Sequence, residues 1–167
     1  MISSLKQLNK ILIKNVILSK HIDHASIYTS LKRYVGNDWH KIHFIQNNKY
    51  EEYSESFLFS NKWINTQLYQ NIIENKQTYD NSLMLKIIKW HPNYNGHFHN
   101  HNDHYCYFKV LSGHLYETLN NQNIITNKYY TPHSIGYISN NIEQHKIKNL
   151  LNDNSYSLHV YFKNNRP

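Results

Sequence analysis

The chain has 167 residues, a formal net charge of +7 and 40% apolar residues. This length and composition fit one domain around one hydrophobic core, and a single cysteine excludes an internal disulfide. No apolar run approaches the ~20 residues of a membrane span, and no signal peptide is evident. The lysines are scattered and the only arginines are Arg33 and Arg166, which argues against nucleic-acid binding. We expect a soluble, cytoplasmic monomer without membrane or nucleic-acid partners.

The N-terminal part of the chain is predicted to be helical. Apolar residues recur at spacings of three and four from Leu5 onward, which favours helix within residues 4–35. Asp23 interrupts this pattern and would cap a second helix, which Gly36 would end. Residues 37–60 have no clear period, so no element is predicted there.

Further along, short β-favouring runs alternate with turn residues. Such runs with no helix between them are typical of an antiparallel sandwich or barrel. We predict one domain over residues 1–167, with a helical cap over 1–36 and a β-sandwich body over about 60–163. The predicted strands are 83–90, 105–111, 114–119, 123–130, 135–139, 145–150 and 156–162.

Residues 97–106, HFHNHNDHYC, place three histidines at alternate positions and the only cysteine just after them. On a strand, His97, His99 and His101 would share one face, and imidazoles on one face can bind a metal ion. The chain has 13 histidines, however, so about one His-x-His is expected by chance. Taken alone, the pattern therefore also fits ordinary surface polarity.

A second segment strengthens the metal hypothesis. His145 opens a predicted strand, Asn149 follows four residues later, and six residues separate Cys106 from Gly113. This arrangement resembles the two motifs of the cupin superfamily. There the first motif has two histidines, usually a glutamate, and a glycine after six residues, and the second has a histidine followed by asparagine at this spacing. The glycines that usually precede each histidine cluster are missing here. The resemblance implies a mainly β cupin jelly-roll sandwich or barrel, here with N-terminal helices.

Cys106 stands where most cupins carry glutamate, and that substitution marks the cysteine dioxygenases. HNHNDHYCYFKVLSGHLYETL, YISNNIEQHKIKN and YSLHVYF each resemble a segment of that family, over roughly residues 83–162. The resemblance implies that His99, His101 and His145 bind Fe(II) and leave positions open for substrate and dioxygen. The histidines expected not to be ligands are His97, His104 and His114.

The resemblance also implies four catalytic residues. In the family a thioether bond joins the cysteine to a tyrosine ring, here Cys106 to Tyr161. A relay of hydrogen bonds orients the phenol, here through Ser157 and His159 to Tyr161, and these residues alternate along a predicted strand. The residues alone also allow a small buried hydrophobe for the cysteine and an ordinary half-buried strand for the relay. Trp90 matches a family position and is expected in the core.

The carboxylate-binding arginine of the family has no counterpart here, because no arginine lies between Arg33 and Arg166. It should fall in the segment 65–79, where the expected occupants of its place are the neutral amides Gln67 or Asn71, whose contact with a carboxylate is weaker by ~1.5–3 kcal/mol. Lys76 or Lys86 could supply a point charge instead. The candidates for substrate binding are Gln67, Tyr69 and Asn71.

The resemblance implies a thiol dioxygenase that adds both atoms of dioxygen to the sulfur of L-cysteine and forms cysteine sulfinic acid. Its cofactor would be Fe(II), and a small thiol and dioxygen would be its substrates. Two alternatives stay open. Related thiol dioxygenases with glutamine at the arginine position prefer 3-mercaptopropionate, and others oxidise cysteamine or N-terminal cysteine residues. The chain could also be a cupin that binds metal without catalysis.

Overall fold

The structure is a computed structural model that describes residues 1–18, 23–42, 44–46, 51–58, 82–101, 104–139 and 144–162. Helices come first in the described residues: α1 (Leu5–Leu18), α2 (His24–Arg33) and the 3-10 helix η1 (Asp38–Lys41). Strands follow: β1 (Ile45–Gln46), β2 (Glu51–Leu58), β3 (Ser82–Trp90), β4 (Tyr105–Ser112), β5 (Leu115–Asn121), β6 (Ile124–Tyr130), β7 (Ile135–Ile138), β8 (Gln144–Lys148) and β9 (Ser155–Phe162).

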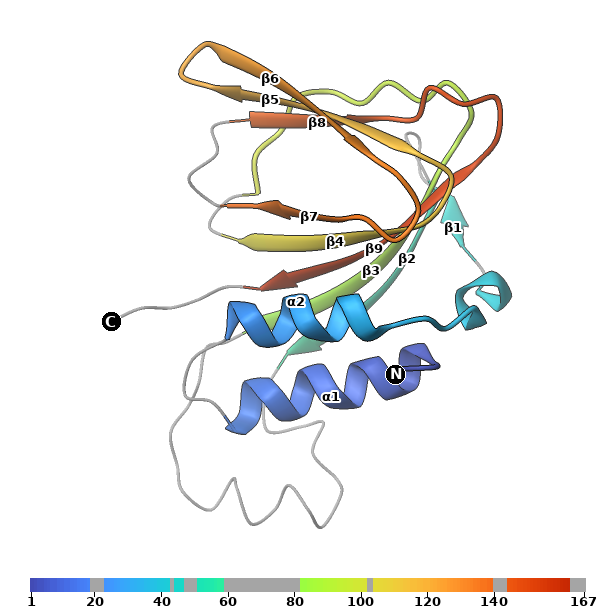
Figure 1. The fold of residues 1–167 in the computed structure, drawn as a ribbon, viewed down its shortest axis with the longest axis vertical. Helices are drawn as coiled ribbons and strands as arrows, with labels where there is room; N and C mark the ends of the chain where they lie inside the picture. Colours follow the sequence, from blue (N-terminus) through green and yellow to red (C-terminus); the bar gives the residue numbers. More distant parts are fainter. Residues whose placement is uncertain are drawn as a thin grey trace.

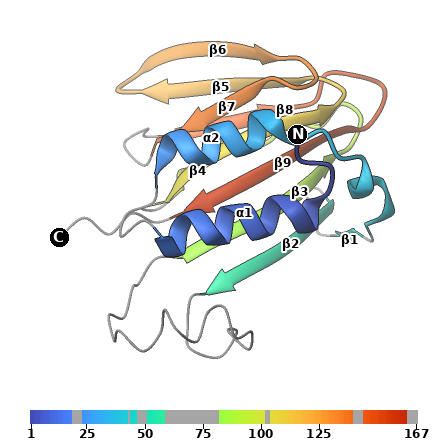
Figure 2. The same cartoon turned by 60° about the horizontal axis from the view of Figure 1, so that its bottom comes forward.

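The strands form two antiparallel sheets that stack as layers. The large sheet has the order β1-β2-β3-β9-β4-β7, and the small sheet has the order β6-β5-β8. Figure 1 shows the small sheet on one face of the large sheet and the two helices on the other, and Figure 2 shows α1 and α2 lying along that second face. This mainly β architecture with N-terminal helices confirms the predicted fold class.

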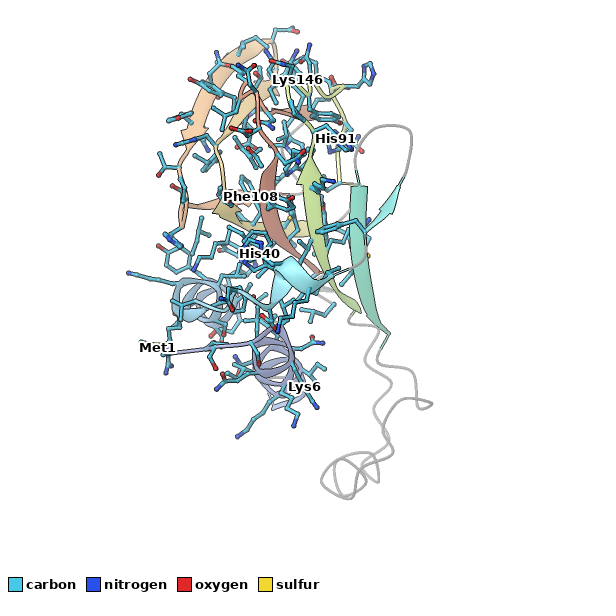
Figure 3. The ribbon with its side chains drawn as sticks, turned by 90° about the vertical axis from the view of Figure 1, so that its right-hand side faces the viewer. Met1, Lys6, His40, His91, Phe108 and Lys146 are labelled. Atoms are coloured by element: carbon cyan, nitrogen blue, oxygen red, sulfur yellow. The ribbon has the colours of Figure 1, made fainter. Side chains whose placement is uncertain are left out.

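Alternation along β9 separates two cores on the two faces of the large sheet, because successive strand residues point to opposite faces. Leu158, Val160 and Phe162 pack on the helix side, whereas Tyr161 packs against the cluster between the sheets. Phe108 marks this second cluster in Figure 3. The buried members between the sheets are Ile88, Trp90, Cys106, Phe108, Val110, Leu115, Tyr130, Ile138 and Ile147.

The helices are fixed to the large sheet by apolar residues at helical spacing. Leu8 and Leu12 of α1, and Ile27 and Leu31 of α2, are buried against the sheet, as an amphipathic pattern requires. The predicted break is confirmed, because the Asp23 side chain caps α2 by accepting a hydrogen bond from the backbone N–H of Ala25.

The sheet begins earlier than the predicted body, at Ile45 instead of near residue 60. Strand β2 is rich in serine and glutamate, which are poor strand formers, so its sequence gave no strand signal. Its order comes from pairing with β3 over its whole length. In the described part of the chain, no helix has the length and apolar character needed to cross a membrane.

Candidate metal centre

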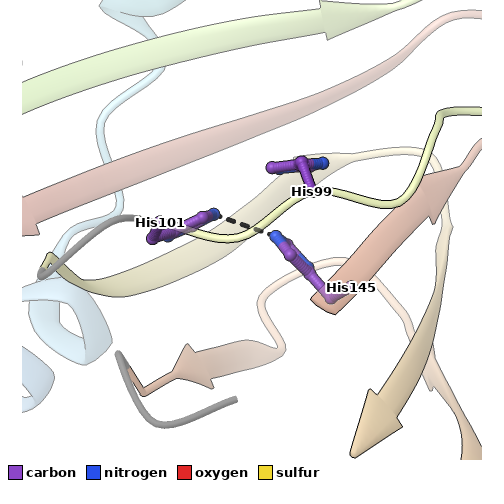
Figure 4. Close-up of side chains that lie close together, drawn as sticks. All are labelled: His99, His101 and His145. Atoms are coloured by element: carbon purple, nitrogen blue, oxygen red, sulfur yellow. Dashed lines mark hydrogen bonds between the residues drawn. The ribbon is translucent and has the colours of Figure 1, made fainter. Parts of the chain in front are cut away.

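Three histidines from two distant segments meet between the sheets. His99 and His101 lie in the connection from β3 to β4, and His145 lies in β8. The backbones of His99 and His145 form an antiparallel bridge with two hydrogen bonds, His99 N–H to His145 O at 2.9 Å and His145 N–H to His99 O at 2.8 Å. This pairing joins the segment between β3 and β4 to the small sheet, and Figure 4 shows the three imidazoles close together.

The nitrogen atoms that these three histidines offer all lie within 4.8 Å of one another. Among the described residues, this is the only group of three or more histidine, cysteine or acidic side chains close enough to hold one ion. His97 stands outside it and contributes its backbone carbonyl, which accepts a hydrogen bond from His99 Nδ1 at 3.1 Å. His104 Nδ1 similarly donates to the carbonyl of His101 at 3.3 Å.

A buried carboxylate orients His145. Glu117 on β5 is fully buried, and its Oε1 accepts a hydrogen bond from His145 Nδ1 at 3.0 Å while its Oε2 accepts one from the Tyr130 hydroxyl at 2.8 Å. Because Nδ1 carries the proton, the Nε2 lone pair of His145 is available to a metal ion. The hydrogen bond from His99 Nδ1 to His97 fixes the same tautomer in His99.

The spacing and charge of the cluster fit a divalent metal ion. His101 Nε2 and His145 Nε2 are 2.9 Å apart, and two nitrogens at right angles around one ion, each about 2.1 Å from it, lie about 3 Å apart. Burial, followed by the charges of His145 and His99, lowers the pKa of His101 to about 3. The imidazole is therefore neutral at physiological pH, as a ligand must be. Neutral imidazoles suit iron, zinc, copper and nickel.

Cys106 and Tyr161 stand opposite each other next to this cluster. They are register partners on the adjacent strands β4 and β9, a pairing that brings side-chain β-carbons to about 4.5–5.5 Å. The Tyr161 ring centre is 5.2 Å from that of His101. Cys106 is fully buried, and burial followed by the charge of Glu117 raises the pKa of its thiol well above the ordinary value. The sulfur is therefore a protonated thiol held beside the phenol.

Ser157 and His159 extend the polar chain along β9. The Trp90 indole N–H donates to Ser157 Oγ at 2.7 Å, and Ser157 Oγ lies 2.8 Å from His159 Nε2. His159 Nδ1 lies 3.6 Å from the Cys106 sulfur. Since the indole only donates, the serine proton is available to Nε2, and the ring proton of His159 then points toward the sulfur. Burial is the first cause that lowers the pKa of His159 well below its usual value, so the ring is neutral.

These contacts place the four predicted catalytic residues in one connected group. The predicted serine-to-histidine link is present, and the histidine also faces the thiol, which sequence reasoning missed. The ring of Tyr161 lies nearly parallel to that of His159, with centres 5.8 Å apart. Trp90 is buried as expected, but its indole N–H is also the first donor in the series of polar contacts from Trp90 to Cys106.

The sequence did not reveal the role of Glu117. The available signal was a charged residue in LYETL, inside a run that otherwise reads as a buried strand. On the adjacent strands β5 and β8, Glu117 pairs with Ile147, two residues from His145. The two side chains are therefore diagonal neighbours on one face.

Asn149, which follows His145 in the second motif, has a structural role. Its buried amide donates to the carbonyls of Trp90, His91 and Asp153. It thereby joins the end of β8 to the end of β3. The predicted substrate-binding candidates Gln67, Tyr69 and Asn71 lie outside the described residues, as does Lys76.

The layered β-fold and the three-histidine cluster together define a metal-binding cupin. A family model described as cysteine dioxygenase type I matches residues 78–164, just over half of the 167 residues. The chain belongs to this family, which confirms the resemblance in the sequence.

Solved structures with a similar fold include proteins of different kinds. The cupin domain of Schizosaccharomyces pombe Cnp3 superimposes with a TM-score of 0.53 at 12% identity, covering 77% of this chain and 74% of that one. The corresponding domain of Drosophila melanogaster CENP-C gives 0.50 at 12%, with 71% of each chain covered. Lactobacillus farciminis oxalate decarboxylase gives 0.52 at 13%, covering 75% of this chain and 32% of that one. At such identities the likeness concerns the fold alone.

Proposed function

We propose that the protein is an Fe(II)-dependent thiol dioxygenase that converts L-cysteine to cysteine sulfinic acid. The reaction RSH + O2 → RSO2H is balanced, because the sulfur loses four electrons and dioxygen gains four, so no further reductant is needed. The observation that carries the proposal is the three-imidazole cluster with Tyr161 beside it and Cys106 opposite that tyrosine. Membership of the cysteine dioxygenase family supports it.

The three histidines would hold the ion and leave its charge uncompensated. When bound, Fe(II) supplies the activation of dioxygen and a lowered pKa for the substrate thiol. Because His99, His101 and His145 are neutral ligands, the site favours an anionic thiolate over a neutral thiol. The Glu117 carboxylate makes His145 a better donor and prevents its ring from rotating.

Tyr161 orients the substrate in this proposal. Its phenol lies next to His101, where its hydroxyl can donate a hydrogen bond to the reacting groups. A thioether bond to Cys106 would fix the ring in place. Forming this carbon–sulfur bond removes one hydrogen from the thiol and one from the ring, and dioxygen, the co-substrate of the enzyme, takes up both hydrogens with their two electrons to give hydrogen peroxide. His159 lies beside both the sulfur and the ring, and Ser157 holds His159 through the contact with its Nε2.

The decisive experiment is anaerobic reconstitution with Fe(II), followed by separate assays of cysteine, 3-mercaptopropionate and cysteamine with dioxygen. Oxygen uptake is measured with an electrode and sulfinate by mass spectrometry. We expect one sulfinate formed for each dioxygen consumed. His101→Ala should abolish both signals, whereas the matched variant His97→Ala should retain them, because the His97 ring is outside the cluster. Retained metal without sulfinate from any of the three thiols would refute the proposal and favour a non-catalytic metal-binding cupin.

A further inference from the structure

Lys86 lies on the same face of the large sheet as the metal centre. Along β3, Leu85 and Ile87 belong to the core under the helices, whereas Ile88 and Trp90 belong to the core between the sheets. Because side chains alternate, Lys86 points to the side of Ile88 and Trp90. Its register partner on β9 is His159, a member of the polar chain beside Cys106.

The ammonium group of Lys86 is close to the phenol. Its Nζ lies 5.9 Å from the centre of the Tyr161 ring, within the range of a cation–π contact, and that ring is next to His101. Lys86 therefore places a positive charge beside the phenol that adjoins the metal centre.

The other lysines of the large sheet point away from this centre. Its six strands contain three lysines and no arginine: Lys86, Lys89 and Lys109. Lys109 is buried on the helix side and donates to the carbonyls of Leu31 and Tyr34. Lys89 lies two residues after Ile87 and four after Leu85 on β3, so its side chain points to the helix side, as theirs do. Lys86 is thus the lysine that these strands direct toward the metal centre.

We infer that Lys86 Nζ binds the carboxylate of the thiol substrate and selects thiols that carry a carboxylate over cysteamine, which carries none. This inference rests on the proposed function. In cysteine and in 3-mercaptopropionate, two carbons separate the sulfur from the carboxylate carbon, so a sulfur at the histidine cluster directs the carboxylate a short distance away. A half-buried ammonium group attracts that anion, whereas it repels the ammonium group of cysteamine. The residue that binds the substrate carboxylate would then lie on β3, not in the segment 65–79.

The test compares three variants of the Fe(II)-loaded protein. Lys86→Met removes the charge but keeps similar bulk, Lys86→Arg keeps the charge, and Lys89→Met removes a charge from the opposite face of the same strand. For Lys86→Met, we expect kcat/KM for cysteine and 3-mercaptopropionate to fall by roughly tenfold or more, with cysteamine unchanged or improved. Lys86→Arg and Lys89→Met should stay within a few-fold of the wild type.

Binding is measured separately from turnover. Anaerobic calorimetry on the wild-type protein should give a lower Kd for 3-mercaptopropionate than for cysteamine, and Lys86→Met should abolish that difference. If no thiol is oxidised, the proposed function is refuted. The binding measurement would still test whether Lys86 binds the carboxylate. An equal fall in kcat/KM for all three thiols in Lys86→Met would overturn the inference. The inference would also be overturned if the wild-type protein bound cysteamine as tightly as 3-mercaptopropionate. This measurement does not depend on the folding of any variant.

Discussion

The carboxylate of Glu117 is fully buried and accepts two hydrogen bonds, one from His145 and one from Tyr130. An ionised carboxylate in such a place is costly unless it is paired. A positive ion held by His145 would stabilise the charge further through the imidazole. We therefore regard Glu117 as a positioning residue that links the metal centre to the small sheet.

Glu117→Gln should weaken metal binding without unfolding the chain. The amide keeps the shape of the side chain but removes the charge that makes the His145 ring a stronger donor, so we expect the Kd for Fe(II) to rise about 10–100-fold. Competition with a chelator under anaerobic conditions measures the change. Tyr130→Phe is the matched control, because it removes the other partner of Glu117 and leaves the bond to His145. An unchanged Kd in Glu117→Gln would show that the carboxylate has no such role.

Cys106 and Tyr161 should become covalently joined during turnover. Their pairing across β4 and β9 brings the sulfur near the ring, and the bond would lock a phenol that is otherwise held by packing. Intact-mass spectrometry of the Fe(II)-loaded protein after turnover should show a species two hydrogen atoms lighter than the sequence. Peptide mapping should locate the loss on a Cys106–Tyr161 cross-linked pair. Tyr161→Phe and Cys106→Ser should each lack this species, and its persistence in either variant would exclude this bond.

Much of the candidate site could be predicted from the sequence because its residues occur in short ordered motifs. The structure brings together His99, His101 and His145 as the resemblance implied, and it sets Cys106 opposite Tyr161. The role of Glu117 was not predictable in this way. It depends on the register between β5 and β8, which no local pattern records.

At the scale of elements, Lys109 connects the large sheet to the helices. Its side chain is 2% exposed, and its ammonium group donates to the carbonyls of Leu31 and Tyr34 at the end of α2. The Leu31 carbonyl also accepts a hydrogen bond from the backbone N–H of Tyr34, so Lys109 is its second donor, and the cation interacts favourably with the negative end of the helix. The position of α2 against β4 therefore depends on this contact as well as on apolar packing.

Lys109→Met should destabilise the protein. The variant keeps the apolar stem but takes the Lys109 donor away from the Tyr34 carbonyl and one of two donors from the Leu31 carbonyl, and a buried polar group left unpaired costs about 1–3 kcal/mol. We expect the free energy of unfolding to fall by about 2 kcal/mol or more, measured by urea denaturation followed by circular dichroism. Lys32→Met, on the exposed side of α2, should change it by less than about 0.5 kcal/mol. Equal effects of the two variants would show that the Lys109 contact does not stabilise the helix.

The helices and strands differed in how well the sequence predicted them. Strands from β3 to β9 were predicted within a residue or two, because β-branched and aromatic runs alternate there with turn residues. The helix break at Asp23 was likewise readable from its capping side chain. Strand β2 was missed because EEYSESFL lacks that signal and is ordered by its neighbour β3.

For the whole molecule, tyrosines with raised pKa values contribute to the response to alkaline pH. Burial, and then the hydrogen bond to Asp38, raises the pKa of Tyr34 far above its ordinary value. Burial, and then the charge of Glu117, does the same for Tyr130. Burial and neighbouring tyrosines raise the pKa of Tyr137 to about 12. All three groups hold their protons more tightly in the folded chain than in the unfolded chain.

The stabilisation from these protons should be fully present below about pH 10, the pKa of an unfolded tyrosine. Above it the unfolded chain releases protons that the folded chain retains, so the free energy of unfolding should fall as pH rises toward the folded pKa values. Urea denaturation at steps from pH 8 to pH 11 measures this slope. Tyr34→Phe should reduce it, since one of the raised groups is removed. A free energy of unfolding that stays level or increases above pH 10 would contradict this expectation.

The central claim is that His99, His101 and His145 share one metal ion. Crystals of the protein loaded anaerobically with Fe(II) allow a direct test, because an anomalous difference map locates iron independently of the chain. We predict one peak per chain, about 2.1 Å from Nε2 of all three histidines. A peak at other residues, or an ion bound by fewer than all three imidazoles, would contradict the account.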